Sequence, residues 1–279
     1  MKMITGLLTL YNFFVSSKAA LTFENSGRKS GWDETFCEGH GIVTEVDQNC
    51  FSSSSSCLKF EQTYDQRYQG RYHCETRSYD AASEGRTSYY GFAFKLADDW
   101  EYDDNRVTIS QFIANLKDVD CGQHKKEWSP TTMIWVQNVN LYTRIRYGNP
   151  CDDNENEKIL KLSKVSKGIW HTITLEISWS TESSGKMDVW FDGVQVAHTE
   201  NIATLPRVSK RQYQFRVGIY PNWFDPLLLE PPKVFIQKGH QKTKVVYIDN
   251  ISYGPNFAAG DPNDSSWNKK LHPLSDVKK

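Results

Sequence analysis

The chain has 279 residues, with 33 Lys or Arg against 34 Asp or Glu, so its formal net charge is −1. A content of 9 Trp, 14 Tyr and 14 Phe excludes disordered and collagen-like chains. The near-neutral charge gives no general basic field for nucleic acid or an anionic membrane, so we expect neither as a partner. A polyanionic partner would have to be bound by a local cluster of cations.

The N-terminus has the pattern of a secretory signal peptide. Lys2 precedes an apolar stretch, and Ser17 and Ala19 stand at −3 and −1 of a cleavage site after Ala19. Nothing downstream is long and apolar enough to anchor the chain in a membrane. We therefore expect residues 1–19 to be removed and the mature protein to be secreted, extracellular and monomeric.

Cysteine usage fits the same compartment. Six cysteines, an even number, allow up to three disulfides in a secreted protein, but the spacing does not determine their pairing. No CxxC pair occurs, which argues against a zinc site. Asn250 and Asn263 each begin a glycosylation sequon, and we expect Asn263 to be the one used because it lies in a polar tail.

Short runs rich in β-branched and aromatic residues follow one another along the chain, separated by turn signals, and many of them alternate apolar with polar residues. The runs are Ser88–Leu96, Val107–Leu116, Met133–Tyr147, Trp170–Trp179, Met187–Ala197, Tyr213–Tyr220 and Lys244–Tyr253. Asp192-Gly193 predicts a two-residue hairpin turn. These features predict one all-β sandwich over residues 20–256, followed by a polar C-terminal tail at 257–279.

Polar side chains on the expected strands are the candidates for chemistry. Side chains at i, i+2 and i+4 of a strand share one face, which groups the polar residues of each segment. The groups are Arg71, His73 and Glu75; Gln111 within an otherwise apolar strand; Arg144 and Arg146; and Arg216 with Tyr220. If these faces line one concave sheet, cations, an amide, an imidazole and a phenol meet in one groove.

That set of groups suits β-elimination on an acidic polysaccharide, a reaction that requires no cofactor. The C5 carboxylate must be neutralised, the C5 proton must be removed, and the departing O4 must be protonated. A hydrolase is disfavoured because no paired carboxylates occur at strand spacing. The residues alone also allow ordinary structural roles, and a non-catalytic carbohydrate-binding module stays a rival hypothesis.

The order of several segments resembles the concanavalin-A-like jelly-roll polysaccharide lyases. The stretch GIWHTITLEISWSTESSGKMDVWFDGVQV is followed by RQYQFRVGIYPNW and VVYIDNISYG, and the upstream segments GRYHCE, YYGFAF and ISQFIANL keep the family's order. The resemblance is greatest to the glucuronan lyases, polysaccharide lyase family 20, with heparin lyase I and the alginate lyases more distant. It implies a β-jelly roll of two antiparallel sheets with a concave substrate face.

The resemblance also implies roles for individual residues. His73 in RYHCE, Gln111 in ISQF and Tyr220 in VGIY match the family's catalytic His, Gln and Tyr, with Gln111 neutralising the carboxylate and Tyr220 as principal acid and base. The expected substrate is β-1,4-glucuronan; alginate and heparin-like polymers are the alternatives, and incomplete Q-x-H and Y-x-K-x-G-x-Y signatures argue against alginate. The expected substrate-binding residues are Arg71, Arg144, Arg146, Arg216, Tyr213 and Trp223.

Members of this fold often hold a structural Ca²⁺ with ligands from the first and last strands. Asp249 in YIDN and Glu24 in TFEN are the matching carboxylates, and oxygen atoms are the ligands that Ca²⁺ takes. The resemblance therefore implies a structural calcium site away from the catalytic face.

Overall fold

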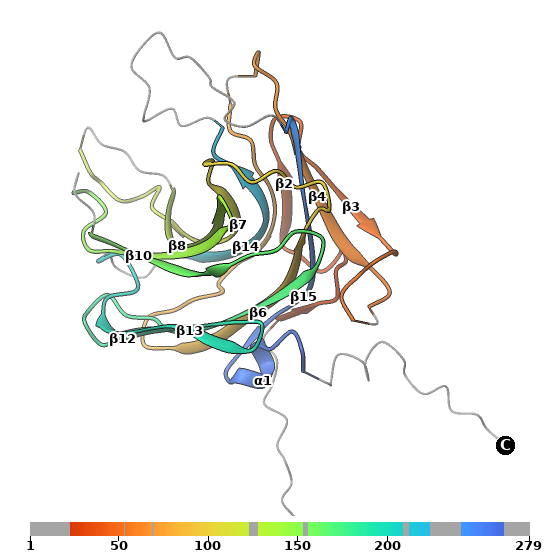
Figure 1. The fold of residues 1–279 in the computed structure, drawn as a ribbon. Helices are drawn as coiled ribbons and strands as arrows, with labels where there is room; N and C mark the ends of the chain where they lie inside the picture. Colours follow the sequence, from red (N-terminus) through yellow and green to blue (C-terminus); the bar gives the residue numbers. More distant parts are fainter. Residues whose placement is uncertain are drawn as a thin grey trace, which may run out of the picture.

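A computed structural model describes residues 23–52, 54–68, 70–122, 128–152, 156–208, 212–223 and 241–264, the side chain of Trp128 excepted. Two antiparallel sheets pack face to face in this part of the chain (Figure 1). The fold is the predicted all-β sandwich and matches a jelly-roll lyase. The predicted signal peptide, residues 1–19, lies outside the described residues.

The first sheet has eight strands. Its order is β13-β12-β11-β6-β15-β4-β3, with β1 also paired to β15. The bounds are β1 (Phe23–Asn25), β3 (Ile42–Val46), β4 (Cys57–Thr63), β6 (Thr87–Leu96), β11 (Trp170–Ser178), β12 (Gly185–Phe191), β13 (Val194–Ile202) and β15 (Thr243–Gly254).

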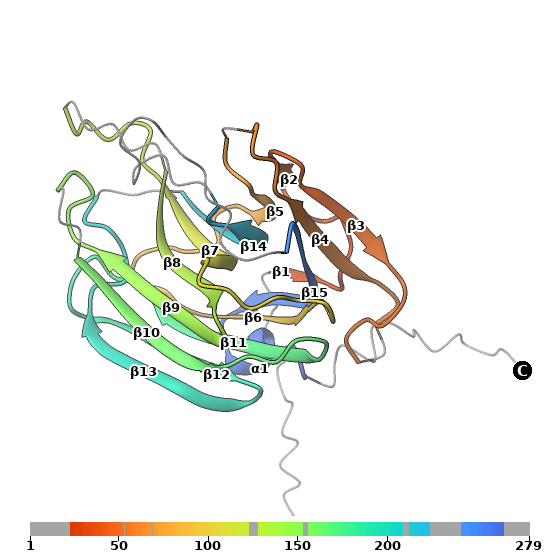
Figure 2. The same cartoon turned by 45° about the horizontal axis from the view of Figure 1, so that its top comes forward.

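The second sheet has seven strands in the order β10-β9-β8-β7-β14-β5-β2. Strand β14 lies between β7 and β5, although it follows both by many residues, as Figure 2 shows. The bounds are β2 (Glu34–Cys37), β5 (Cys74–Ser78), β7 (Val107–Asn115), β8 (Trp128–Gln137), β9 (Asn140–Tyr147), β10 (Asn156–Lys164) and β14 (Tyr213–Pro221).

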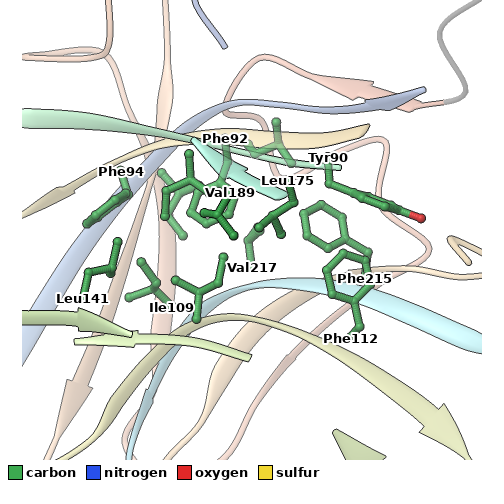
Figure 3. Close-up of a cluster of buried hydrophobic side chains, with 14 of the residues drawn as sticks. Tyr90, Phe92, Phe94, Ile109, Phe112, Leu141, Leu175, Val189, Phe215 and Val217 are labelled. Carbon is green, nitrogen blue, oxygen red and sulfur yellow. The ribbon is translucent and has the colours of Figure 1, made fainter. Parts of the chain in front are cut away.

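The core lies between the two sheets and is built by alternation along each strand. On β14, Tyr213, Phe215, Val217 and Ile219 are buried in the core, which directs the residues between them to the opposite face. Figure 3 shows aromatic side chains of both sheets meeting there. Tyr90 and Phe112 have ring centroids 4.7 Å apart in an edge-to-face arrangement, a geometry that aromatic pairs prefer.

The predicted strands are present with small differences. Asp192 and Gly193 have φ values of 51° and 77° and join β12 to β13, as a type I′ hairpin turn requires. The predicted run Met133–Tyr147 is instead two strands, β8 and β9, which reverse direction at Asn138 with φ 50°. Asn tolerates this left-handed conformation better than other non-glycine residues.

Three disulfides join the six cysteines in the pairs Cys37–Cys74, Cys50–Cys57 and Cys121–Cys151. The first connects β2 to β5 beside the predicted catalytic His73. Three disulfides are typical of proteins that fold in an oxidising compartment.

The C-terminal region differs from the predicted polar tail. Its first residues form a helical turn, α1 (Phe257–Gly260), which packs on the outer face of the eight-stranded sheet, where Phe257 contacts Tyr89 and Trp190. Asn250 is buried and donates from Nδ2 to the Pro262 carbonyl, so its sequon is inaccessible, whereas Asn263 is exposed. In the part of the chain that the structure describes, no helix has the length and apolar character of a membrane span.

Candidate active site

The predicted catalytic residues lie on the outer face of the seven-stranded sheet, on or next to the three adjacent strands β5, β14 and β7. We call this surface the active face and define it by His73, Glu75, Gln111, Arg216 and Tyr220. Arg216 and Gln111 are directly opposite each other across β14 and β7, and Glu75 is opposite Gly218 across β5 and β14. Residues 73, 111 and 220 are therefore brought together by the topology.

His73 immediately precedes β5 and is buried against the ring of Tyr220. The two ring centroids are 5.3 Å apart with planes at 70°, and Phe36 lies on His73 at 5.2 Å. The His73 Nδ1 atom is 3.8 Å from Glu38 Oε2, and its buried Nε2 has no hydrogen-bond partner among the described residues.

Burial lowers the pKa of His73 below its ordinary value of 6.5, and the nearby carboxylates of Glu75 and Glu38 oppose that shift. Desolvation disfavours the charged imidazolium. His73 is therefore neutral near pH 7, and a neutral imidazole can accept a proton.

Gln111 points to the active face because the alternation of inward and outward side chains along β7 shifts by one residue. Val107 and Ile109 point into the core, and so do Phe112 and Ala114, so the alternation slips by one residue between them. The pairing of β7 with both neighbouring strands shifts register on the N-terminal side of Gln111, which is the effect of a β-bulge. The slip turns the Gln111 amide outward among the polar residues.

A buried carboxylate connects Gln111 to Arg216. Glu75 Oε1 accepts a hydrogen bond from Gln111 Nε2 at 2.5 Å, and Arg216 Nη1 lies 3.3 Å from Glu75 Oε2. Arg216 also donates from Nε to Gln214 Oε1 at 2.8 Å. Burial lowers the pKa of Arg216, while Glu75 raises it. The amide and the guanidinium are thus held in place by one anion.

The predicted arginines Arg144 and Arg146 lie on β9, two strands from Gln111. Met133 of β8 is opposite both Gln111 and Arg144, so all three share the face. Both arginines contact Glu157 Oε2 of β10, at 2.7 Å from Arg144 and 3.1 Å from Arg146. Burial lowers the pKa of Arg144 to about 10, which leaves it protonated at neutral pH.

Three predicted binding residues lie elsewhere. Tyr213 is 3% exposed and belongs to the core between the sheets, because it alternates with Gln214 on β14. Trp223, also 3% exposed, packs with Tyr64 and Tyr72 in a separate aromatic cluster. Arg71 is exposed in the segment before β5 and does not share a strand face with His73 and Glu75. The predictions for Tyr213 and Trp223 as groove residues are wrong.

Other side chains of the active face were not predicted as binding residues. Trp135 of β8 and Tyr142 of β9 are stacked, with centroids 5.5 Å apart at 15°, and the Arg106 guanidinium lies 4.8 Å above Trp135. Arg77 lies 4.6 Å from the ring of Phe36. The alternation of side chains within Met133–Tyr147 could have placed Trp135 on this face, because it lies two residues from Met133 on the same strand.

The two predicted metal ligands, Asp249 and Glu24, are not grouped in one site. Asp249 is fully buried, and its carboxylate accepts hydrogen bonds from the Phe51 and Asn250 amides and the Ser54 hydroxyl. Burial raises its pKa to about 7. The Cys50 and Cys57 sulfurs are the other potential ligand atoms grouped with it among the described residues, but their disulfide removes them as ligands.

Glu24 is not in that group. The Ser54 hydroxyl lies within hydrogen-bond distance of both the Asp249 carboxylate and the Ser56 carbonyl. Its oxygen and that carbonyl are therefore further oxygen atoms near the buried carboxylate. This oxygen-rich set fits the preference of Ca²⁺. Asp249 as a calcium ligand stays a prediction, and Glu24 is not grouped with it.

The chain resembles known proteins in both sequence and fold. The family model described as polysaccharide lyase matches residues 24–252. The crystal structure of endo-β-1,4-glucuronan lyase from the fungus Trichoderma reesei aligns with a TM-score of 0.78 and 36% identity, covering 88% of this chain and 100% of that one. Alginate lyase vAL-1 from Chlorella virus shares the fold at a TM-score of 0.51 and 13% identity, covering 81% and 93% of the two chains. No curated protein sequence matches the chain significantly.

The β-sandwich with its polar outer face and the match over most of its length define the class: the chain belongs to the polysaccharide lyase family. It is an enzyme of the lyase type. Within that family it is a relative of the fungal glucuronan lyase, to which it is 36% identical over an alignment that covers 88% of this chain.

Proposed function

We propose that this lyase cleaves a polyuronate, β-1,4-glucuronan, by β-elimination on the active face. The observation that carries the proposal is the contact between His73 and Tyr220 next to a Gln111 amide and an Arg216 guanidinium held by Glu75. The substrate is argued from the likeness to the Trichoderma reesei enzyme.

The reaction breaks the C5–H and C4–O4 bonds of the uronate unit and forms a C4=C5 double bond. The C5 proton passes to a base, and a proton is delivered to O4 as the glycosidic oxygen departs. Negative charge builds on the C5 carboxylate as its proton leaves, so hydrogen-bond donors aimed at that carboxylate lower the barrier.

Gln111 is proposed to neutralise the substrate carboxylate. Its Nε2 carries two N–H groups, and one of them is engaged by Glu75, so the second can donate to a carboxylate oxygen. Arg216, held by the same Glu75 on the neighbouring strand, adds positive charge at this position.

Tyr220 is proposed as principal acid and base, assisted by His73. In glucuronate the C5 proton and O4 lie on the same side of the ring, so one phenol can take the first proton and return it to O4. His73 is neutral at pH 7 because burial lowers its pKa, and its ring lies against Tyr220, where it can accept the phenolic proton.

The proposal is tested by incubating purified protein with glucuronan, alginate and heparin and following ultraviolet absorbance of the 4,5-unsaturated product. Activity is expected on glucuronan, and Tyr220→Phe should abolish it while binding persists. Product with added water and no double bond would instead identify a hydrolase. Binding without turnover would identify a non-catalytic carbohydrate-binding module.

We further propose that Asp249 holds a structural Ca²⁺, that Asn263 is glycosylated, and that the protein is secreted as a monomer. Calcium would neutralise a buried carboxylate that otherwise meets only amide and hydroxyl donors among the described residues. Removing it with EDTA should lower the melting temperature, and added Ca²⁺ should restore it. The same treatment should leave the melting temperature of Asp249→Asn unchanged.

A further inference from the structure

Four side chains form a row across the outer face of the eight-stranded sheet. Lys59 of β4 is directly opposite Tyr247 of β15, Tyr247 is opposite Lys95 of β6, and Lys95 is opposite Trp170 of β11. Each of the first three is flanked in sequence by core residues, so it points away from the core. We call these four residues the back row; Figure 2 shows the strands that carry it side by side.

The centre of the back row is a lysine between two aromatic rings. The Lys95 Nζ atom lies 4.8 Å from the centroid of Tyr247 and 5.6 Å from that of Trp170. No ion pair joins Lys95 to a carboxylate among the described residues, although its side chain is largely buried. The rings stabilise its charge by cation–π attraction.

A hollow of about 670 Å³ adjoins the back row. It is lined by Lys59 and Tyr247 together with the segment that leads from β3 toward β4. In that segment the Asn49 carbonyl, at the rim of the hollow, accepts a hydrogen bond from Trp170 Nε1 at 2.9 Å. The Cys50–Cys57 disulfide closes the same segment, so the rim that holds Trp170 is preorganised.

The charges at this place favour an acidic ligand. The ionisable groups around the hollow are balanced, with Arg28 and Lys59 against Glu45 and Asp47. Lys59 is also paired with Glu61 at 3.0 Å. Lys95 therefore supplies a positive charge that no described carboxylate neutralises. Half-buried Tyr and Trp rings beside it offer apolar faces to sugar rings.

We propose that the back row and its hollow form a second binding site for an acidic polysaccharide chain. The row crosses three strand spacings, roughly 14 Å, which is long enough for more than one sugar unit. It lies on the opposite side of the sandwich from the active face, so one site cannot block the other. The choice of polyuronate as ligand rests on the proposed function; the site itself does not.

The test is native electrophoresis in gels containing glucuronan, with Tyr220→Phe as the parent so that the polymer stays intact. Adding Tyr247→Ala or Lys95→Gln should reduce the retardation of the parent several-fold. Lys164→Gln, which removes an exposed lysine from β10, is the matched control and should leave it unchanged. If Tyr247→Ala or Lys95→Gln lowers the melting temperature, Lys59→Gln replaces it as the test variant of the back row.

With the active enzyme, Tyr247→Ala should raise KM for the polymer several-fold and leave turnover of a short oligoglucuronate unaltered. Unchanged retardation in all three back-row variants would overturn the proposal. If a neutral polysaccharide retards the parent equally and the same variants lose that retardation, the proposal that the ligand is acidic is overturned. If the protein cleaves no polyuronate but the back-row variants still lose retardation, the proposed function fails and the second site stands.

Discussion

Glu75 is the residue on which the geometry of the active face depends. The residue is 1% exposed, and its carboxylate joins an amide on β7 to a guanidinium on β14. Gln111 and Arg216 are the groups proposed to meet the substrate, so Glu75, which holds both of them, is proposed to act as a positioning residue. Removing one partner of a buried charge pair leaves the other uncompensated, and here the same change also releases Gln111.

Glu75→Gln should lower kcat about 100-fold, because small displacements of positioned groups cost that much, with a smaller change in KM. It should also lower the melting temperature, since Arg216 loses its counter-charge. Glu157→Gln is the matched control: it removes a carboxylate that pairs with arginines of the same face, and it should affect KM more than kcat. A fall in melting temperature with kcat unchanged would show that Glu75 is only structural.

The pH dependence of activity should reflect His73. Because burial lowers the pKa of this residue below 6.5, the neutral form persists as pH falls through 6.5 and is lost only at lower pH. The acid limb of kcat/KM should therefore lie below pH 6.5 and disappear in the residual activity of His73→Gln. An acid limb above pH 6.5 would contradict this assignment. A pH-rate profile between pH 4 and 9 decides the matter.

At the scale of elements, Gly218 is a position where β14 leaves no room for a side chain beside β5. Its φ is 155°, and a Cβ there would lie 2.2 Å from the Cys74 carbonyl oxygen and 2.7 Å from the Glu75 Cα. The register of β14 against β7 also shifts between Val217 and Tyr220. Arg216 and Tyr220 lie on either side of this glycine and share one face of the strand, because Phe215, Val217 and Ile219 alternate with them in the core.

Gly218→Ala should therefore force β14 and β5 apart, reduce stability by about 2 kcal/mol or more, and reduce activity. The control is Gly193→Ala in the β12–β13 turn, where a Cβ meets nothing within 4 Å. That change should cost about 1 kcal/mol through its positive φ and leave kcat unaltered. Chemical denaturation and product formation measure both effects.

Strand alternation explains what the sequence could and could not predict. The polar set on β14 occupies even positions, which correctly groups Arg216 with Tyr220; the same rule places Tyr213 in the core, against its prediction as a groove residue. Arg71 was misplaced because the chain becomes a strand only at Cys74. Trp223 lies beyond β14, where alternation gives no information. The carboxylate–amide–guanidinium network needs β14 between β5 and β7, and pairing of distant strands is not encoded locally.

At the scale of the whole molecule, the Cys37–Cys74 disulfide connects two edge-side strands next to His73. Closing a loop of 37 residues should contribute about 4 kcal/mol by chain entropy. Replacing both cysteines with alanine should lower the melting temperature and also reduce kcat, because β2 carries Phe36 against His73.

Replacing Cys121 and Cys151 is the control for that experiment. This disulfide closes a loop of similar length, 30 residues, but it lies away from β5. The double variant should lose comparable stability and keep its kcat when assayed below its melting temperature. Equal loss of kcat in both double variants would show that the first disulfide has no particular connection with the site.

The position of β14 has a consequence for how activity is acquired. The strand that carries Arg216 and Tyr220 inserts between β5 and β7, which end at Ser78 and Asn115, far before β14 begins at Tyr213. Such distant pairing is slow, because loop-closure entropy is lost before the contacts form. A chain still being synthesised has His73 and Gln111 before it has the strand β14 that joins them in one site. Catalysis can begin only after Tyr220 has been added to the chain and β14 has paired, so a nascent chain that carries only β5 and β7 is inert.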